Sequence, residues 1–414
     1  MSSSQGLLNR AEIKTERREQ ARRRRNALLL VLPLLVFVGF SFVAPIASML
    51  YRSVYNPTLV ELIPKTVDLL GAWNGKATPP PDTLRTFAQE LHDLAQRRES
   101  GRVAAAVNRA YPGASSLINA TARKLRSAGN NDLAKNGDKL LLLADPRWAD
   151  KTLWTAIDQL GAPYSTQNFL TALDLERDAQ GHIKQRDSAR IYLELYGKTL
   201  GMALTITLLC LAMGYPVAYY LAHAPGRRAG WLLVLVLLPF WTSLLVRTTA
   251  WIALLQTHGI VNSVLMAGGL IDAPIEMLYT RFATIVAMTH ILLPFMILPL
   301  YSVMKGIDPA YVRAALSLGS KPFGAFVRVY LPQTLPGLSA GALLVFIISV
   351  GYYITPALVG GTDGQMISNL IAFHMQQSNN WGLAAALGTL LLVLIMLLYW
   401  VYDRLVGTSN LKLG

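Results

Sequence analysis

The sequence has little that could carry out covalent or redox chemistry. It contains one cysteine, Cys210, so the chain cannot form an internal disulfide or a cluster of thiolate ligands. Its six histidines show no metal-ligand spacing, and we therefore predict no metal site. We also predict no catalytic residue, and no enzymatic activity of the chain itself.

Acidic residues are absent from the centres of the apolar segments. Between residues 197 and 271 the only charged residues are Lys198, Arg227, Arg228 and Arg247. Carriers that are coupled to protons or sodium usually keep ionisable residues inside the membrane. The scarcity of acids therefore disfavours a secondary carrier or channel, which we keep as an alternative function.

A nucleotide-binding loop is also missing. Gly197-Lys198-Thr199 resembles the end of a phosphate loop, but such a loop needs a glycine where the chain has Tyr192, and a strand before it. An apolar stretch follows instead of the expected context. We therefore expect this chain to bind no cofactor, and any nucleotide energy must come from a partner.

Apolar residues are abundant, at 53% of the chain against 15% charged residues. They gather in segments of about 20 residues, the length of helix that crosses a bilayer. We predict an all-α integral membrane protein that is surrounded by membrane lipid. Six transmembrane helices are predicted, at 27–50, 200–222, 231–252, 283–301, 336–357 and 381–402.

The net charge of +14 is concentrated on one side of this six-span model. Residues 1–26 hold eight Lys and Arg against three Glu, and further cations lie in the loops after spans two and four and after span six. Basic loops lie on the cytoplasmic side of a membrane. The pattern predicts that both termini are cytoplasmic, and it argues against nucleic-acid binding.

The same pattern gives a domain organisation. A large polar insert separates the first span from the other five, and it contains 19 Lys and Arg against 16 Asp and Glu. We predict that it lies outside the cytoplasm. The predicted parts are a basic segment at 1–26, transmembrane helix one at 27–50, an extracytoplasmic helical insert at 51–196, a five-helix core at 197–403 with a cytoplasmic loop at 303–335, and a cytoplasmic tail at 404–414.

Helical periodicity is clear within the insert. At 84–96, apolar residues recur on one face of a helix, and Asp82 is the predicted N-cap. Further helices are predicted at 102–111, 115–127, 131–143 and 147–160. The stretch 165–187 is predicted to lie along the membrane surface before span two.

The polar segment between spans four and five has a pattern of its own. It runs from Asp308 to Pro336 and is longer than most connections between helices. Pro309 and Pro322 suit the first turns of two short helices, and Gly319 between them can take the left-handed conformation that ends the first. The sequence predicts a helical hairpin that a partner could bind.

This segment resembles the cytoplasmic loop of ABC importer permease subunits with the MetI-like type I fold. In that family the loop reads Glu-Ala-Ala, three residues, Gly, nine residues, Ile, any residue, Leu-Pro. Arg313 stands where the pattern has Glu. The residues in register, which the resemblance implies contact the ATPase, are Arg313, Ala314, Ala315, Gly319, Val329, Leu331 and Pro332.

The resemblance extends to span one and to residues 190–403, and it is strongest to spermidine/putrescine-type permeases. It implies a permease in the bacterial inner membrane that imports polyamines by ATP hydrolysis in partner subunits. The implied partners are two ATPase subunits, a second permease subunit and a periplasmic substrate-binding protein. Permeases for ferric iron or for another organic solute look similar, so these substrates remain alternatives. The insert between 60 and 160 has no counterpart in the family.

Three aromatic residues are candidates for the substrate pathway. Tyr352 and Tyr353 lie near the end of span five, and Trp241 lies within span three. Aromatic faces attract cations by about 1–2 kcal/mol once desolvated. Simple packing explains these residues equally well, so a role in the pathway is a hypothesis.

Overall fold

A computed structural model describes residues 10–177, 182–186 and 190–406. The chain forms two compact units, Met1–Tyr164 and Ser165–Gly414. Residues 1–9 of the predicted basic segment lie outside the described residues. The same is true of 407–414, most of the predicted cytoplasmic tail.

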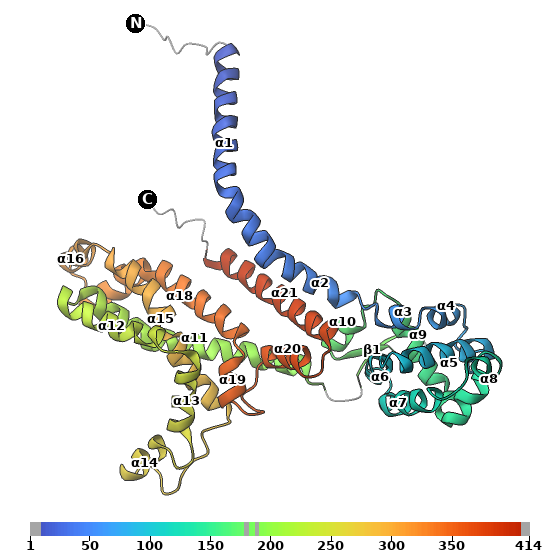
Figure 1. The fold of residues 1–414 in the computed structure, drawn as a ribbon. Coiled ribbons are helices and arrows are strands. Elements are labelled where there is room, and N and C mark those ends of the chain that lie inside the picture. The colour runs from blue at the N-terminus through green and yellow to red at the C-terminus, as the bar shows by residue number, and fades with distance from the viewer. Residues whose placement is uncertain (1–9, 178–181, 187–189, 407–414) are drawn as a thin grey trace. The chain divides into compact units, whose positions relative to one another are not determined.

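The first unit begins with one long helix (Figure 1). Helix α1 (Arg10–Val38) passes through a single π turn, η1 (Gly39–Val43), into α2 (Ala44–Val54) without a break. Its apolar part, Leu29–Val54, is long and apolar enough to cross a membrane. The predicted first span is therefore confirmed, with its end four residues further along the chain.

The insert is a small helical domain, as its periodicity predicts. The two short helices α3 and α4 were not predicted, because their apolar residues are interrupted by Pro64. Asp82 is not the N-cap of the helix that follows: that helix begins one residue earlier at Pro81, so Asp82 lies in its first turn and pairs with Arg85. The helices are α3 (Thr58–Leu62), α4 (Pro64–Gly71), α5 (Pro81–Gln96), α6 (Ser100–Asn108), α7 (Ala114–Leu125), α8 (Asn130–Ala144), the 3-10 turn η2 (Pro146–Ala149) and α9 (Lys151–Gly161).

Three aromatic rings form the centre of the insert. Phe87, Trp148 and Trp154 are fully buried, and their ring centroids are 5.0–5.6 Å apart. Both indole N–H groups are satisfied, by the hydroxyl of Thr121 at 2.9 Å and by the carbonyl of Trp148 at 2.8 Å. The insert therefore has a hydrophobic core of its own.

The insert also begins and ends at adjacent positions. The backbone N–H of Asn56 donates to the carbonyl of Pro163 at 2.8 Å. Beside it, Tyr55 and Tyr164 form an isolated antiparallel bridge, with ring centroids 5.3 Å apart. The long excursion thus leaves the first helix and returns at almost the same point.

The second unit starts at Ser165, so residues 165–196 belong with the membrane core rather than with the insert domain. It opens with α10 (Gln167–Ala172) and an antiparallel pair of strands, β1 (Leu175–Arg177) and β2 (Ile183–Gln185). The helices that follow are α11 (Tyr192–His223), α12 (Gly226–Trp241), α13 (Leu244–Leu255), α14 (Ile260–Ala267), α15 (Arg281–Lys305), α16 (Pro309–Ser317), α17 (Pro322–Ala325), the π turn η3 (Phe326–Tyr330), α18 (Leu331–Gly351), α19 (Ile354–Val359), α20 (Ile367–Gln376) and α21 (Trp381–Val406).

The described residues contain six helices long and apolar enough to span a membrane, which confirms the predicted number. The third span was predicted wrongly at 231–252. The chain breaks at Thr242, and the Ser243 hydroxyl caps the next helix by accepting from the N–H of Val246 at 3.2 Å. Because Pro239 lacks an N–H, it weakens α12 just before this break. The span-length element is instead Leu244–Ala267.

Helices α11, α15 and α18 form the core of the second unit, and two glycines allow them to approach closely. A Cβ added at Gly341 of α18 would lie 3.0 Å from Met296 Sδ and 3.1 Å from its carbonyl oxygen. A Cβ at Gly214 of α11 would lie 3.1 Å from the same methionine. A Cβ added at Gly201 or at Gly388, in contrast, would have nothing within 4 Å.

We predict that Gly341→Val destabilises the protein, because the added methyl groups must separate α18 from α15. Overpacking of this kind costs about 1–3 kcal/mol. Thermal unfolding in detergent should show a lower midpoint for Gly341→Val than for Gly388→Val, the matched control in an open position. Equal midpoints would contradict the close contact.

Candidate functional site

The predicted hairpin begins with α16, which has clear start signals. The carboxylate of Asp308 accepts a hydrogen bond from the N–H of Ala310 at 2.8 Å, and Pro309 occupies the first helical position. None of the residues of α16 is buried. Most helical stability comes from packing of an apolar face. A helix of nine residues without a buried side chain therefore indicates a missing partner.

Gly319 ends this helix as its sequence position predicts. Its φ of +87° is left-handed, a conformation that glycine adopts without steric cost. The N–H of Gly319 donates to the carbonyl of Leu316, and the N–H of Ser320 donates to that of Ala315, both at 3.0 Å. These two bonds make the Schellman motif that closes a helix.

The second arm differs from the prediction of another short helix. Helix α17 starts at Pro322 as expected, but it continues through η3 into α18, so Pro322–Gly351 forms one span-length element. Pro332 does not stop it, because it lies in the first turn of α18, and Pro336 is accommodated within that helix. Gln333 donates to the carbonyl of Val329 at 2.8 Å. The hairpin therefore has one free helix and one arm that is rigidly joined to span five.

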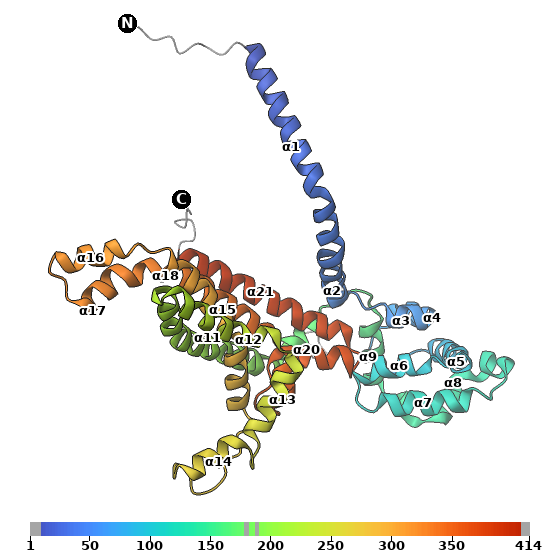
Figure 2. The ribbon, with the colours of Figure 1, turned by 60° about the vertical axis from the view of Figure 1, so that its left-hand side comes forward.

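Helices α16 and α17 lie at one end of the second unit (Figure 2). Apolar side chains are exposed at the turn between them. Leu318 is 89% exposed and Phe323 is 79% exposed, on either side of Gly319. Tyr311 of α16 is exposed as well. Cations flank these residues at Arg313, which is also exposed, and at Lys321. An apolar patch rimmed by charge is typical of a protein interaction site.

The predicted contact residues fall into two groups. Arg313, Ala314, Ala315 and Gly319 lie on α16 and in its cap, and all except Ala315 are exposed. Val329, Leu331 and Pro332 lie where the π turn passes into α18. The structure thus places one group on the free helix and the other at the base of the rigid arm.

Tyr352 and Tyr353 lie at a break between α18 and α19. Their carbonyls accept hydrogen bonds from the Ser368 hydroxyl at 2.6 Å and from the Asn369 amide at 2.8 Å, so α20 satisfies the unwound backbone. The Tyr352 ring is half-buried against the core, and that of Tyr353 is exposed. Trp241 is 73% exposed at the end of α12. Among the described residues, no ring contact or hydrogen bond joins it to either tyrosine.

Sequence reasoning missed a polar surface on α13 and α15. The indole N–H of Trp251 donates to Nδ1 of His290 at 3.3 Å, and the His290 side chain is otherwise exposed. The Nε of Arg247, one turn before Trp251, is buried without a hydrogen-bond partner among the described residues. Polar groups on a membrane helix seldom face lipid. The sequence did contain one signal for this surface: Arg247 and Trp251 are four residues apart, which places them on the same face of a helix.

An ion-pair triad holds the turn between α19 and α20. The Asp363 carboxylate accepts from the guanidinium of Arg281 at 3.0 Å, and the ammonium of Lys198 lies 3.6 Å away. Burial alone would raise the pKa of Asp363, but hydrogen bonds and charge from Arg281, with the charge of Lys198, outweigh it and lower that pKa. Helices α11 and α15 are thereby joined to this turn at one carboxylate.

Known proteins are similar to this chain over its second unit. Residues 214–407 match the model of the family described as "Binding-protein-dependent transport system inner membrane component". The spermidine/putrescine transport system permease protein PotB of Escherichia coli is 37% identical over 52% of this chain and 80% of its own length. PotB of Haemophilus influenzae is 38% identical over 54% and 78%. The inner membrane ABC transporter permease protein YdcU of Escherichia coli is 31% identical over 51% and 71%.

We predict that Gly319→Ala loosens α16, because a Cβ in the left-handed region costs about 1–2 kcal/mol. Amide hydrogen exchange within α16 should become about tenfold faster. Gly306→Ala is the control, since Gly306 ends α15 at an ordinary φ of −84°. Unchanged exchange in Gly319→Ala would contradict the role of the Schellman motif.

We predict that Asp363→Asn lowers stability at neutral pH by about 0.5–1 kcal/mol, the range of exposed ion pairs. Because folding lowers the pKa of Asp363, the wild-type advantage is present above the unfolded pKa and is lost as pH falls through the folded one. Unfolding of both proteins should be compared between pH 7 and pH 3. A difference that persists at pH 3, or that does not shrink in high salt, would argue against the triad.

Proposed function

The chain belongs to the inner membrane components of binding-protein-dependent transport systems, and from this premise we propose that it imports polyamines of the spermidine or putrescine type. It acts as the permease of an ABC importer. The relatives that support this substrate class are the PotB proteins. Its part in transport is conformational, and ATP is hydrolysed by its partners.

The hairpin at Asp308–Pro332 carries the proposal. It combines a free helix with no buried residue, an exposed apolar turn at Leu318 and Phe323, and a rigid connection into span five. A force applied to α16 would therefore be transmitted along Pro322–Gly351 into the membrane. This is the geometry expected of a permease that a separate ATPase moves.

Further partners follow from the same proposal. Two ATPase subunits bind the hairpins of two permease subunits, and a periplasmic binding protein delivers the substrate. Arg313, Lys321 and Arg328 make the hairpin basic, and Asp308 is engaged in capping α16. The complementary surface of the ATPase should therefore be acidic opposite Arg313.

The orientation rests on charge. The Arg22–Arg25 run, the basic hairpin and Arg404 lie on one side of a six-span topology, which the positive-inside rule assigns to the cytoplasm. Both termini are then cytoplasmic, and the insert lies outside the bacterial inner membrane. The insert is positioned to meet the binding protein.

Tyr352, Tyr353 and Trp241 are the proposed aromatic contacts for a polyamine in the pathway.

One observation favours a second substrate class, an organic solute with an acidic group. The half-buried guanidinium of Arg247 has an unpartnered Nε on the same polar surface as His290. A cation at this position would repel a polyamine and attract a carboxylate.

We predict that proteoliposomes with the complete transporter accumulate radiolabelled spermidine only with ATP and the binding protein. An ATPase variant that cannot hydrolyse ATP should abolish uptake, because the permease has no energy source of its own. Uptake that persists without the ATPase would identify a secondary carrier. If spermidine is not taken up but an organic acid is, the transported substrate belongs to the second class.

Crosslinking tests the hairpin separately from the substrate. A cysteine at Ala315 in a Cys210→Ser background should crosslink to the ATPase, and the reaction should depend on the nucleotide state. A cysteine at Lys76 of the insert is the control and should not react. Labelling of the Ala315 position by an impermeant reagent outside intact cells would overturn the proposed orientation.

A further inference from the structure

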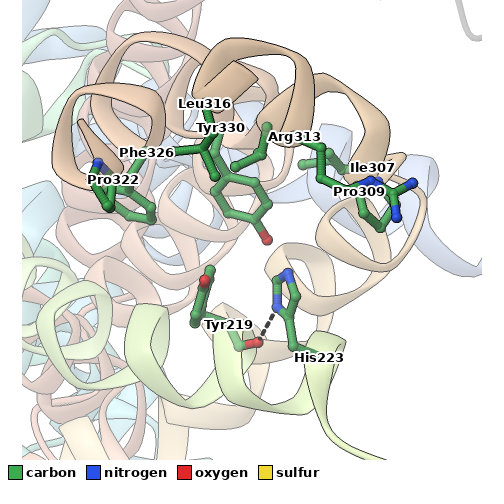
Figure 3. A pocket seen from close by; sticks show the side chains of 10 residues that line it. Tyr219, His223, Ile307, Pro309, Arg313, Leu316, Pro322, Phe326 and Tyr330 are labelled. Atoms are coloured by element: carbon green, nitrogen blue, oxygen red, sulfur yellow. Dashed lines mark hydrogen bonds between the residues drawn. The ribbon is translucent and has the colours of Figure 1, made fainter. Parts of the chain in front are cut away.

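A cavity of about 320 Å³ lies between the hairpin and the end of α11 (Figure 3). This volume is at the small end of the range for ligand pockets. Its walls come from three segments: Tyr219 and His223 of α11, Arg313 and Leu316 of α16, and Phe326 and Tyr330 of the π turn. The cavity is thus bounded both by the free helix and by the membrane core.

Three of the ten lining residues carry an aromatic ring of the Phe or Tyr type. Phe326 and Tyr330 are stacked, with ring centroids 5.7 Å apart and planes at 22°. The Tyr219 ring meets that of Tyr330 edge to face at 5.4 Å. The wide turn of η3 places these side chains together, and single π turns are frequent at functional sites. A flat or apolar group would pack well between these rings.

One hydroxyl in this cavity is without a partner. Tyr330 is only 4% exposed, and its hydroxyl makes no hydrogen bond among the described residues. Figure 3 shows this hydroxyl directed into the space beside His223, whose Nδ1 is already engaged with the carbonyl of Tyr219 at 2.8 Å. Unsatisfied buried hydroxyls are costly and uncommon. The hydroxyl is therefore a donor that none of the described residues uses.

The charge around the cavity selects the sign of the ligand. Arg313 is the only Lys, Arg, Asp or Glu among the ten lining residues. Lys305, Lys321 and Arg328 add positive charge nearby, and the one acid of the hairpin, Asp308, caps α16. Aromatic walls alone would suit an ammonium group, but this positive field opposes one. An anion is favoured.

We propose that the cavity binds a small anionic amphiphile. Its apolar body packs against Tyr219, Phe326 and Leu316. Its carboxylate or phosphate accepts a hydrogen bond from Tyr330 and pairs with Arg313. An acidic phospholipid of the surrounding leaflet and a free organic acid share this chemistry.

Binding here would affect coupling, a consequence that rests on the proposed function of the hairpin. The ligand contacts α11 of the core and α16 of the hairpin at the same time. It would therefore hold α16 at a fixed distance from α11 and resist movement of the hairpin by the ATPase. The site is a control point for transport, separate from the substrate pathway.

Binding can be measured on the full-length permease in nanodiscs of phosphatidylcholine, without the ATPase. The probes are 2-naphthoate, its neutral amide and 2-naphthylmethylammonium, which share one apolar body and differ in charge. Calorimetry should detect 2-naphthoate alone. Tyr330→Phe and Arg313→Gln should each weaken it about tenfold, because each removes one contact to the anion.

Two further variants test whether binding depends on the cavity itself rather than on a general change in the protein. Leu316→Trp should fill the space and abolish binding. Tyr311→Phe is the matched control, since Tyr311 is exposed on the same helix and does not line the cavity. Tyr330→Phe should unfold at a temperature no lower than that of the wild type, because the hydroxyl it removes has no partner and is costly to bury. Equal binding of all three probes, or unaltered binding by Tyr330→Phe and Leu316→Trp, would overturn the site.

Two further experiments identify where the ligand comes from and whether its binding affects transport. Weaker 2-naphthoate binding in nanodiscs with phosphatidylglycerol would show that a lipid headgroup occupies the site, and unchanged binding would favour a soluble acid. In the assembled transporter, 2-naphthoate should lower ATP hydrolysis in the wild type and leave Tyr330→Phe unaffected. Binding without that effect would overturn the control of coupling. Failure of the Ala315 crosslink would instead reject the docking role of the hairpin.

Discussion

Two breaks in the described membrane helices depend on side chains that satisfy the exposed backbone. A bilayer interior offers no water to unpaired N–H and C=O groups, so each one costs several kcal/mol. Ser243 caps α13 after the break at Thr242. Ser368 and Asn369 bond the carbonyls that are released at Tyr352 and Tyr353. The bundle can therefore contain interruptions, and those interruptions are where its helices can change direction.

The same rule explains the two arms of the hairpin. At Gly319 the chain ends a helix by its own backbone hydrogen bonds, so α16 does not need the core to close it. Pro332 lies in the first turn of α18, where proline is tolerated, so the second arm continues through the π turn into span five. One arm is free and the other is continuous with the membrane. This asymmetry suits a lever better than two equal short helices would.

The sequence predicted elements whose signals are local and strong. Length and hydropathy were sufficient for six spans, and Pro309, Gly319 and Pro322 were sufficient for the hairpin turn. Predictions failed where a tertiary contact decides the outcome. The break at Thr242 is stabilised by a side chain within a continuous apolar run, and a π turn joins α17 to α18, so that Pro332 begins α18 instead of ending a helix. The unpartnered Tyr330 hydroxyl and the Asp363 triad join residues far apart in sequence, so no periodicity reveals them.

Positive charge is common to the two sites that we propose in the second unit, one at the hairpin and one on α13. The hairpin is basic around an aromatic cavity, and Arg247 adds an unpartnered Nε on α13. Acids, in contrast, are used structurally, as Asp308 caps a helix and Asp363 joins three segments. In our proposals, recognition therefore relies on cations and rings, while these two carboxylates hold the framework.

The hydrogen bond between Asn56 and Pro163 has a consequence for the history of the chain. A domain whose two ends meet can be gained or lost by recombination while the flanking helices keep their register, because the junction needs only a short peptide. The helical excursion is then a module that an ancestral permease could acquire in one step. Closing the chain directly between these two residues would recreate the smaller form.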